Sequence, residues 1–416
     1  MSTISLFPPI GASSSAPATV QYAGAQLDSF GRLRVSQPDT LFDSQNRYGA
    51  DTQFDTSTGT GGSTTALTDE SSVQMSVTTT SGSFAYRQSY RSFAYQPGKS
   101  LLVLATFVMN AGKTGLRQRV GYFNTQNGVF FQQDGTSRSF VLRSSVTGSA
   151  SDARTVTQAN WNGDKLNGTG PSGLTLDVSK AQILFMDFEW LGVGSVRCGF
   201  VINGQYIICH TFENANQIAN VYMTTATLPI RYEIENTGAT ASASSMKQIC
   251  SSVMSEGGYS AVVAPSLARR TTILSSIGTT FVPLVSIRLK ASRTGAVVLP
   301  YLINCLPTST ANYEFALVKN ATLTSASWNN TSSPNVEFDV ASTSMTGGTI
   351  VQSDFVSSSN QSAAAVTGPT GYNYDLQLGA TVGGTSDIYT LGVRVLSGSS
   401  GDAIGSIAFY DLTRGG

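Results

Sequence analysis

Asp187 and Glu189 are the side chains whose type and spacing most resemble a catalytic pair. They alternate with Phe188 and Trp190 in a run typical of a strand, where alternate residues point to the same face. The two carboxylates would therefore lie about 7 Å apart, on the face opposite Met186 and the other apolar residues of the run. Two carboxylates at such a separation can act as acid and base in the hydrolysis of a glycosidic bond.

The residues around this pair do not complete that chemistry. Jelly-roll glucanases place a third carboxylate beside the pair, in the pattern Glu-x-Asp-x-x-Glu. Here Ile183 and Phe185 precede Asp187 where a carboxylate would be needed, and Gly192 follows. We therefore favour two carboxylates on a solvated sheet face. A catalytic pair and a contact to a glycan or cation are the alternatives, and we predict no catalytic residue.

Trp161 and Trp328 each stand in a segment rich in Asn, where a ring that stacks on a sugar would lie. A loop tryptophan more often covers the edge of a hydrophobic core, because its large apolar body is best buried. We favour that interpretation for both. Together with Asp187 and Glu189, they remain the candidate contacts to a glycan or a partner.

His210 is the single histidine, and the 4 cysteines include no Cys-x-x-Cys spacing. One histidine cannot complete a zinc site with cysteines so spaced, and no phosphate-binding loop or Gly-x-Ser-x-Gly elbow occurs. We expect no metal and no cofactor. Cys198 and Cys209 should face each other across a hairpin, either bonded or as two buried thiols. We favour thiols, which fit synthesis in a reducing cytoplasm.

The elements that must position these residues are strands. The clearest is a hairpin over residues 196–211, with Asn203-Gly204 at its tip. This dipeptide favours a type I′ turn, because both residues tolerate positive φ. A two-residue turn there pairs Cys198 with Cys209 and puts both on a core face.

The same alternation recurs along the chain and predicts an all-β protein. Strands are expected over 72–79, 83–90, 100–110, 120–123, 129–133, 139–143, 181–190, 221–225 and 228–235, and then over 281–289, 297–305, 313–319, 336–340, 349–353, 373–378, 388–396 and 404–411. Residues 245–254 fit a helix or a strand, and we favour a strand. We predict two antiparallel, jelly-roll-like β-sandwiches, over residues 46–260 and 261–416, preceded by an extended N-terminal arm over residues 1–45.

The amino-acid composition limits the classes of partner that we expect. Charged residues make up only 12% of the chain, and Lys plus Arg equals Asp plus Glu at 25 each. Nucleic-acid binding needs a concentrated positive field, which the sequence lacks, so we expect no nucleic acid. No targeting segment and no run of about 18 apolar residues occur, so we expect no membrane insertion. A β-rich surface with few charges leaves strand edges poorly defended, which favours permanent assembly.

The N-terminal arm combines prolines with exposed-looking apolar residues. Pro8-Pro9 and Pro17 interrupt any regular element in it. Its apolar side chains would be covered if the arm docked on a neighbouring subunit or another protein, and we favour docking over a frayed terminus. These candidate assembly residues are Ile4, Leu6, Phe7 and Ile10.

Several segments, in the same order, resemble virion structural proteins of tailed bacteriophages. They are LDSFGRLRVS (27–36), TLFDS (40–44), YQPGKS (95–100), GTGPSG (168–173), DFEWLGVG (187–194) and LPIRYEI (228–234), within residues 25–260. The resemblance implies a concanavalin-like jelly roll and a place at the tail, neck or head surface of a virion. It implies no particular chemistry.

From this resemblance we expect a non-enzymatic virion structural protein, synthesised in the host cytoplasm and partnered by other virion proteins. Assembly as a homo-oligomer is expected, with a trimer preferred, and the second sandwich would face outward or bridge to a neighbour. Two alternatives remain open. One is a carbohydrate-binding fibre module that recognises a host-surface glycan, and the other is a polysaccharide depolymerase.

Overall fold

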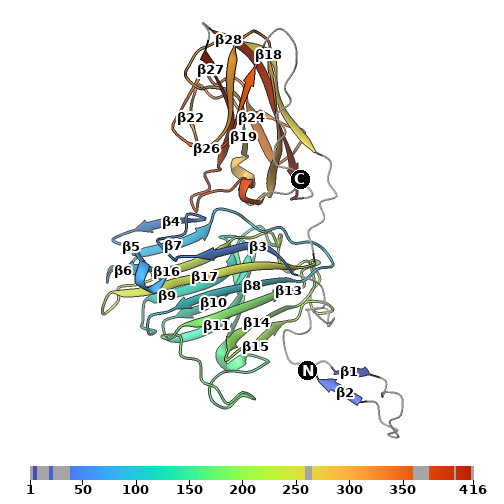
Figure 1. The fold of residues 1–416 in the computed structure, drawn as a ribbon. Coiled ribbons are helices and arrows are strands. Elements are labelled where there is room, and N and C mark those ends of the chain that lie inside the picture. The colour runs from blue at the N-terminus through green and yellow to red at the C-terminus, as the bar shows by residue number, and fades with distance from the viewer. Residues whose placement is uncertain are drawn as a thin grey trace. The chain divides into compact units, whose positions relative to one another are not determined.

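The fold is described from a computed structural model, which describes residues 3–6, 18–21, 38–257, 265–358, 374–397 and 400–413. The chain divides into two units, one of Met1–Ser89 with Tyr95–Ser260, the other of Tyr90–Ala94 with Ala261–Gly416. Regular structure in the described residues is β-strand apart from four short 3-10 turns, so the all-β prediction is confirmed (Figure 1). The turns are η2 (Thr68–Glu70), η3 (Gln158–Asn160), η4 (Ala291–Arg293) and η5 (Tyr374–Leu376).

The first unit contains two antiparallel sheets. The seven-stranded sheet has the order β12 (Ser151–Thr157), β11 (Ser137–Ser144), β10 (Gly128–Asp134), β9 (Leu116–Phe123), β16 (Ile230–Asn236), β7 (Phe84–Ser89) and β4 (Phe54–Gly59). The eight-stranded sheet has the order β15 (Gln205–Phe212), β14 (Val196–Ile202), β13 (Gln182–Phe188), β8 (Leu101–Val108), β17 (Ser244–Glu256), β6 (Ser72–Val77) and β5 (Ser63–Leu67), with β3 (Pro38–Gln45) paired to β17.

Aromatic side chains join the two sheets into one sandwich. The ring of Tyr122 on β9 packs edge-on against Phe188 on β13, at 5.2 Å between ring centroids. Phe131 on β10 stacks on Phe107 on β8 across the core, at 6.1 Å between centroids. All four side chains are fully buried. The strand expected over 100–110 is β8, which lies between β13 and β17 in the middle of its sheet.

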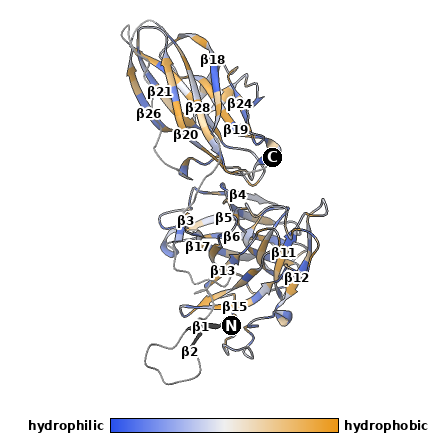
Figure 2. Cartoon of the chain, turned by 90° about the vertical axis from the view of Figure 1, so that its right-hand side faces the viewer, coloured by the Kyte–Doolittle hydropathy of each residue, from blue (hydrophilic) through white to orange (hydrophobic). Residues whose placement is uncertain are grey.

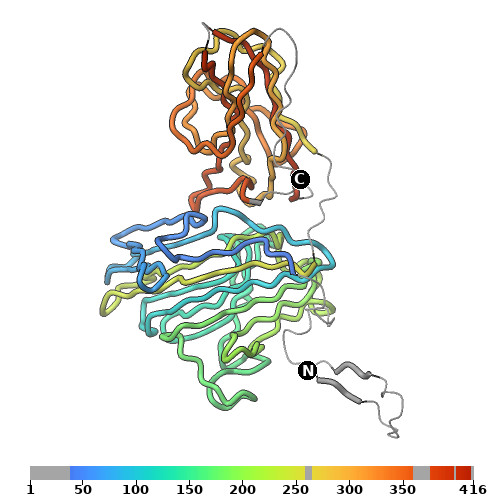
Figure 3. Tube along the Cα trace, viewed as in Figure 1, coloured from blue at the N-terminus to red at the C-terminus, as the bar shows by residue number. Residues whose placement is uncertain are grey.

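Strands far apart in sequence meet in this unit. β16 pairs with β7 and β9, and β17 pairs with β3, β6 and β8 (Figure 3). The ambiguous segment over 245–254 is therefore a strand, as favoured, because it supplies the partner that β3, β6 and β8 need. β6 and β7 flank the turn at Ser81-Gly82 but belong to different sheets, so this turn connects the two layers.

The second unit also packs two sheets around a core. A three-stranded sheet has the order β18 (Ser266–Ile277), β28 (Gly401–Asp411) and β20 (Val298–Pro307). A six-stranded sheet has the order β23 (Asn329–Asn330), β24 (Val336–Asp339), β19 (Val282–Leu289), β27 (Ile388–Ser397), β21 (Asn312–Lys319) and β26 (Thr349–Ser357). Side chains from both, such as Phe409 and Phe315, share one buried cluster. β22 (Thr322–Thr324) pairs separately with β25 (Ser344–Thr346).

Two predicted strands are wrong. Residues 221–225 form no strand, because Tyr222 N donates to the carbonyl of Gly192 and Thr224 N donates to Oδ1 of Asn127. Near the second unit's end, Tyr374–Leu376 is a 3-10 turn where a strand was expected over 373–378. At residues 221–225 loop contacts satisfy the backbone, so apolar alternation alone was misleading there.

Both units carry hydrophobic and hydrophilic residues on the same strands, as period-two alternation requires (Figure 2). In the N-terminal arm, the described backbone forms a two-stranded antiparallel sheet of β1 (Thr3–Leu6) and β2 (Ala18–Gln21). No helix among the described residues has the length and hydrophobicity to cross a membrane.

Candidate functional site

The site builds on the face of the seven-stranded sheet that points away from the sandwich core. On β16, Tyr232 and Ile234 are fully buried in the core, so the alternate residues Arg231, Glu233 and Glu235 point to the opposite face. β9 alternates in the same way, and its Arg119 shares that opposite face. Pairing of β16 with β9 therefore lines up acidic and basic side chains on one surface.

The register of β16 and β9 matches each glutamate to an arginine. Glu233 pairs with Arg119 and Glu235 pairs with Arg117 as direct cross-strand neighbours. Arg119 Nη1 lies 3.0 Å from Glu233 Oε2, and Arg117 Nε donates to Glu235 Oε1 at 2.7 Å. Tyr86 on β7 adds a hydroxyl donor to Glu235 Oε2 at 2.8 Å. Glu235 is therefore held in place from both neighbouring strands, β9 and β7.

Glu233 lies between two guanidinium groups. Besides Arg119, it accepts a hydrogen bond from Arg231 Nε at 2.5 Å. Arg231 Nη1 donates to Gln88 Oε1 at 2.7 Å, and Arg119 Nε donates to Gln132 Oε1 at 2.9 Å. The Glu233 side chain is only 5% exposed, so this network is largely desolvated and its ion pairs are strong.

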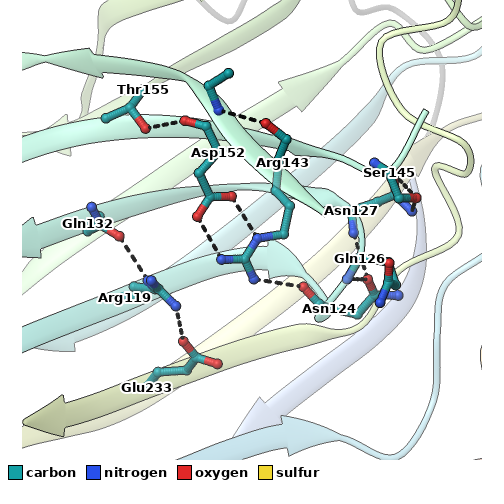
Figure 4. A network of polar contacts seen from close by, with 12 residues as sticks. Arg119, Asn124, Gln126, Asn127, Gln132, Arg143, Ser145, Asp152, Thr155 and Glu233 are labelled. Atoms are coloured by element: carbon teal, nitrogen blue, oxygen red, sulfur yellow. Dashed lines mark hydrogen bonds and ion pairs between the residues drawn. The ribbon is translucent and has the colours of Figure 1, made fainter. Parts of the chain in front are cut away.

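A further ion pair extends the charged surface to the sheet edge. Arg143 on β11 binds Asp152 on β12 through Nε and Nη2, both at 2.8 Å, in a bidentate arrangement (Figure 4). Arg143 Nη1 also donates to the carbonyl oxygen of Asn124 at 3.2 Å. Figure 4 shows the Arg143–Asp152 pair close to the Arg119–Glu233 pair.

Aromatic rings pack against the guanidinium groups in cation-π contacts. Arg143 stands over the Phe130 ring at 5.1 Å, and Arg119 stands over the same ring at 5.5 Å. Arg231 stands over Tyr86 at 4.9 Å. Gly121, the register partner of both Arg231 and Phe130, has no room for a side chain, because an added Cβ would lie 2.6 Å from Phe130. These contacts fix the planes of the arginines.

The charged surface is hollowed into a groove, which we call the arginine groove. Its volume is about 400 Å³, within the range of about 300–1,000 Å³ found for small-molecule sites. It is lined by Tyr86, Arg117, Arg119, Thr125, Arg143, Ala150, Asp152, Arg231, Glu233 and Glu235. Four arginines against three carboxylates leave one positive charge in the lining.

The protonation states of the groove suit binding better than proton transfer. Burial acts to raise the pKa of Glu235, but the charge of Arg117 and hydrogen bonds from Tyr86 and Arg117 bring this pKa below its usual value. Burial also opposes ionisation of Asp152, and again the bond from Arg143 lowers the pKa below normal. A general acid needs a raised carboxyl pKa, which these two residues lack.

The predicted pair Asp187 and Glu189 lies in the other sheet, outside the arginine groove. Asp187 is 1% exposed and accepts hydrogen bonds from Ser100 and Arg197. The expected solvated face is therefore wrong at Asp187, because its carboxylate is buried and bound by these two side chains. Glu189 follows the strand's end and accepts bonds from Ser195 N and Oγ, at 3.1 and 2.9 Å.

The two tryptophans occupy different surroundings. Trp161 is 2% exposed, packs on Phe140 at 4.8 Å and donates from Nε1 to the carbonyl of Val156. It covers the core and offers no face to a sugar ring. Trp328 is half-buried, and the guanidinium of Arg288 lies 4.0 Å from the centre of its ring.

In the hairpin of β14 and β15, the strand register differs from the prediction by one residue at the end away from the turn. Asn203 and Gly204 have φ of 52° and 76°, as the predicted turn requires. A bulge then intervenes, so Cys198 faces His210 and the expected pairing of Cys198 with Cys209 is wrong. All four cysteines are free, as favoured, although Cys250 is only half-buried. No group of three or more metal-binding side chains occurs among the described residues.

The candidate assembly residues of the arm cannot be compared with the structure. Phe7 and Ile10 lie outside the described residues, and for Ile4 and Leu6 only the backbone of β1 is described.

The sequence reasoning missed the arginine groove. Its signal is present in the alternating runs Arg231-x-Glu233-x-Glu235 and Arg117-x-Arg119, where charges stand between residues that belong to the core. Period-two alternation of charges marks one face of a strand. Only the pairing of the two strands shows that opposite charges face each other.

Comparison with protein-family models and with curated protein sequences gives no match. Among solved structures, the chain is similar to the cellulose-induced protein Cip1, with 12% identity over 51% of this chain and 96% of that one and a TM-score of 0.33. It is also similar to the carbohydrate recognition domain of Emp47p, with 11% identity, 53% and 98% coverage and a TM-score of 0.33.

A β-1,3-glucanase from Mycobacterium marinum is a further similar structure, with 9% identity, 52% and 98% coverage and a TM-score of 0.36. Each of these similarities covers about half of this chain. The likeness is one of fold, and it says nothing about a virion or about activity.

Proposed function

We propose that the protein is a non-enzymatic structural protein of a tailed-phage virion, which assembles with copies of itself and with other virion proteins. The sequence segments that resemble such proteins support the location. The observation that carries the assembly role is an exposed apolar edge strand in the second unit, β26.

β26 is the last strand of the six-stranded sheet, and β21 is its one neighbour among the described strands. Phe355 is 68% exposed, and Ile350 is 50% exposed on the same strand. An edge strand of nine residues with apolar side chains invites pairing with another chain, since no described strand lies beside its outer backbone groups. We propose that a second copy covers this edge, within a homo-oligomer for which three-fold symmetry is preferred.

The non-enzymatic part of the proposal is supported by the contacts of four carboxylates. Each of them has a chemistry that could catalyse glycoside hydrolysis, but each is bound by a neighbouring side chain. Asp187 is bound by Arg197, and Glu189 is bound by Ser195. In the arginine groove, Glu233 and Glu235 are each bound by arginine. A carboxylate so engaged is held in a fixed orientation, which suits a structural or binding role.

Purified particles test the location. We expect a specific antibody to label intact virions at one site, and we expect the chain in particle fractions by mass spectrometry. A chain found only in the soluble fraction of an infected-cell lysate would show that the virion location is wrong.

The oligomeric state tests the edge strand. We expect the full chain to form an oligomer in light scattering after size exclusion, and Phe355→Lys to shift it to monomer. Tyr48→Lys is the matched control, because Tyr48 is an exposed aromatic residue of the first unit, at 84%. A monomeric wild-type chain, or equal dissociation of both variants, would overturn the assembly proposal.

The depolymerase alternative is tested by release of reducing sugar from host polysaccharide. We expect the wild-type chain to release no more reducing sugar than the variants Asp187→Asn, Glu189→Gln and Glu233→Gln. Release that any one of these variants abolishes would make the protein an enzyme and identify the residue responsible.

A further inference from the structure

We propose that the arginine groove binds an acidic sugar, a ring that carries several hydroxyl groups and one carboxylate. The inference goes beyond the structural role, since it concerns a ligand in the first unit and does not depend on particle assembly. It stands on four features of the groove: its unused donors, its unused acceptors, its charge and its size.

The unused donors belong to two buried arginines. Arg119 uses Nε for Gln132 and Nη1 for Glu233, and Arg231 uses Nε for Glu233 and Nη1 for Gln88. Within the described part of the chain, Nη2 of each has no hydrogen-bond acceptor, and neither nitrogen is closed off from solvent. Both side chains line the groove. A guanidinium edge of this kind binds a carboxylate better than any neutral group, because charge assists the hydrogen bond.

The unused acceptors belong to the glutamates. Each carboxylate oxygen can accept about two hydrogen bonds. Glu233 Oε1 receives one from Arg231, and Glu235 Oε2 receives one from Tyr86. Each oxygen therefore has capacity for a hydroxyl donor of a ligand. A simple inorganic anion brings few such donors, whereas a sugar ring brings several next to its acceptors.

Charge and size point to the same class of ligand. The lining carries four arginines and three carboxylates, so one positive charge is left to be matched by an anion. A groove of about 400 Å³ has room for a small ligand and not for a folded protein segment. The rings under Arg119, Arg143 and Arg231 hold their guanidinium planes in place, so little order is lost on binding.

Two variants are designed to change the groove without unfolding the first unit. Ala150→Trp fills the groove from an exposed loop and removes no ion pair. Arg117→Gln removes a positive charge whose side chain is 28% exposed. Arg269→Gln is the matched control, because it removes an exposed arginine from β18 of the second unit. Circular dichroism and thermal melts check that all three variants fold.

The experiment is calorimetric titration of the full chain with glucuronate, galacturonate and N-acetylneuraminate, each also as its methyl ester, and with sodium sulfate. We expect at least one acid to bind, its ester to bind at least tenfold more weakly, and its affinity to fall as salt rises. Ala150→Trp and Arg117→Gln should weaken binding at least tenfold, and Arg269→Gln should not.

Several results would overturn the inference. They are no binding of any of the three acids, equal binding by folded Ala150→Trp and wild type, and sulfate binding as tight as that of the best acid. Equal affinity for acid and ester would also overturn it, because the guanidinium donors would then recognise no carboxylate.

Discussion

Arg197 on β14 is the direct cross-strand neighbour of Asp187 on β13, and its guanidinium binds the buried carboxylate. The Asp187 side chain is 1% exposed and that of Arg197 is 14% exposed. A carboxylate that was expected to meet solvent is thus held inside the eight-stranded sheet by a neighbour ten residues away. This relationship gives Asp187 an arginine partner in place of the solvent contact that the sequence suggested.

We expect Arg197→Met to lower the free energy of unfolding by about 3–5 kcal/mol, because it removes a guanidinium group that binds a buried carboxylate. The double variant Asp187→Leu with Arg197→Met should lose less than Arg197→Met alone, since no buried charge then remains. Urea denaturation of both measures the difference. Lys247→Met is the control, because its partner Glu70 is 52% exposed and the loss should be at most about 1 kcal/mol. Equal losses for Arg197→Met and Lys247→Met would contradict this account.

At the turn of Asn203-Gly204, glycine should be needed only because of its backbone conformation, and not because a side chain would clash. Gly204 has φ of 76°, and a Cβ added there would have no heavy atom within 4 Å, so Gly204→Ala meets no clash. We expect a loss of about 1–2 kcal/mol, the cost of a left-handed conformation for an L-residue.

Gly278→Ala is the matched control for this turn, because Gly278 also has open space but lies outside the positive-φ region. We expect it to be neutral or to raise stability by up to about 1 kcal/mol. Thermal denaturation of both variants gives the comparison. A Gly204→Ala variant as stable as wild type would refute the type I′ assignment.

His210 should stay neutral in the folded protein down to mildly acidic pH. Burial and the charge of Arg154 lower its pKa to about 4, and its Nδ1 accepts a bond from Asn162 N at 3.4 Å. The unfolded state, with a pKa of about 6.5, binds the proton first. This contribution to stability is therefore complete above pH 6.5 and is lost as pH falls towards 4.

His210→Asn should remove that part of the pH dependence, measured by denaturation between pH 7 and 4. The lowered pKa values of Asp152 and Glu235 act at lower pH, because their stabilisation disappears only as the carboxyl groups become protonated. A His210 imidazole that titrates near 6.5 by NMR in the folded protein would show that this assignment is wrong.

The cysteines should remain thiols without added reductant. The bulge in β15 puts His210 opposite Cys198, and burial raises the pKa of both Cys198 and Cys209. We expect slow reaction of these two with a thiol reagent in the native protein, and four reactive thiols after denaturation. Only two thiols in the denatured, non-reduced chain would mean that a disulfide forms.

Local sequence predicted most strands correctly, because each strand's in-and-out alternation is written in consecutive residues. It failed over 221–225, where loop contacts take the place of a neighbouring strand, and over 373–378, where the chain forms a 3-10 turn. It also failed at Cys209, because a bulge depends on how one strand fits its neighbour and leaves no mark in the alternation of side chains.

The sequence by itself determined the β character of the chain, the tight turn at Asn203-Gly204 and the faces of the individual strands. These follow from the backbone preferences and side-chain period of neighbouring residues. Only the tertiary structure decided which charges meet: Arg119 and Glu233 stand 114 residues apart and become neighbours because β9 pairs with β16. It likewise buried Asp187 and left the arginine groove open, because burial depends on which strands surround a residue, and that pairing is made across the whole fold.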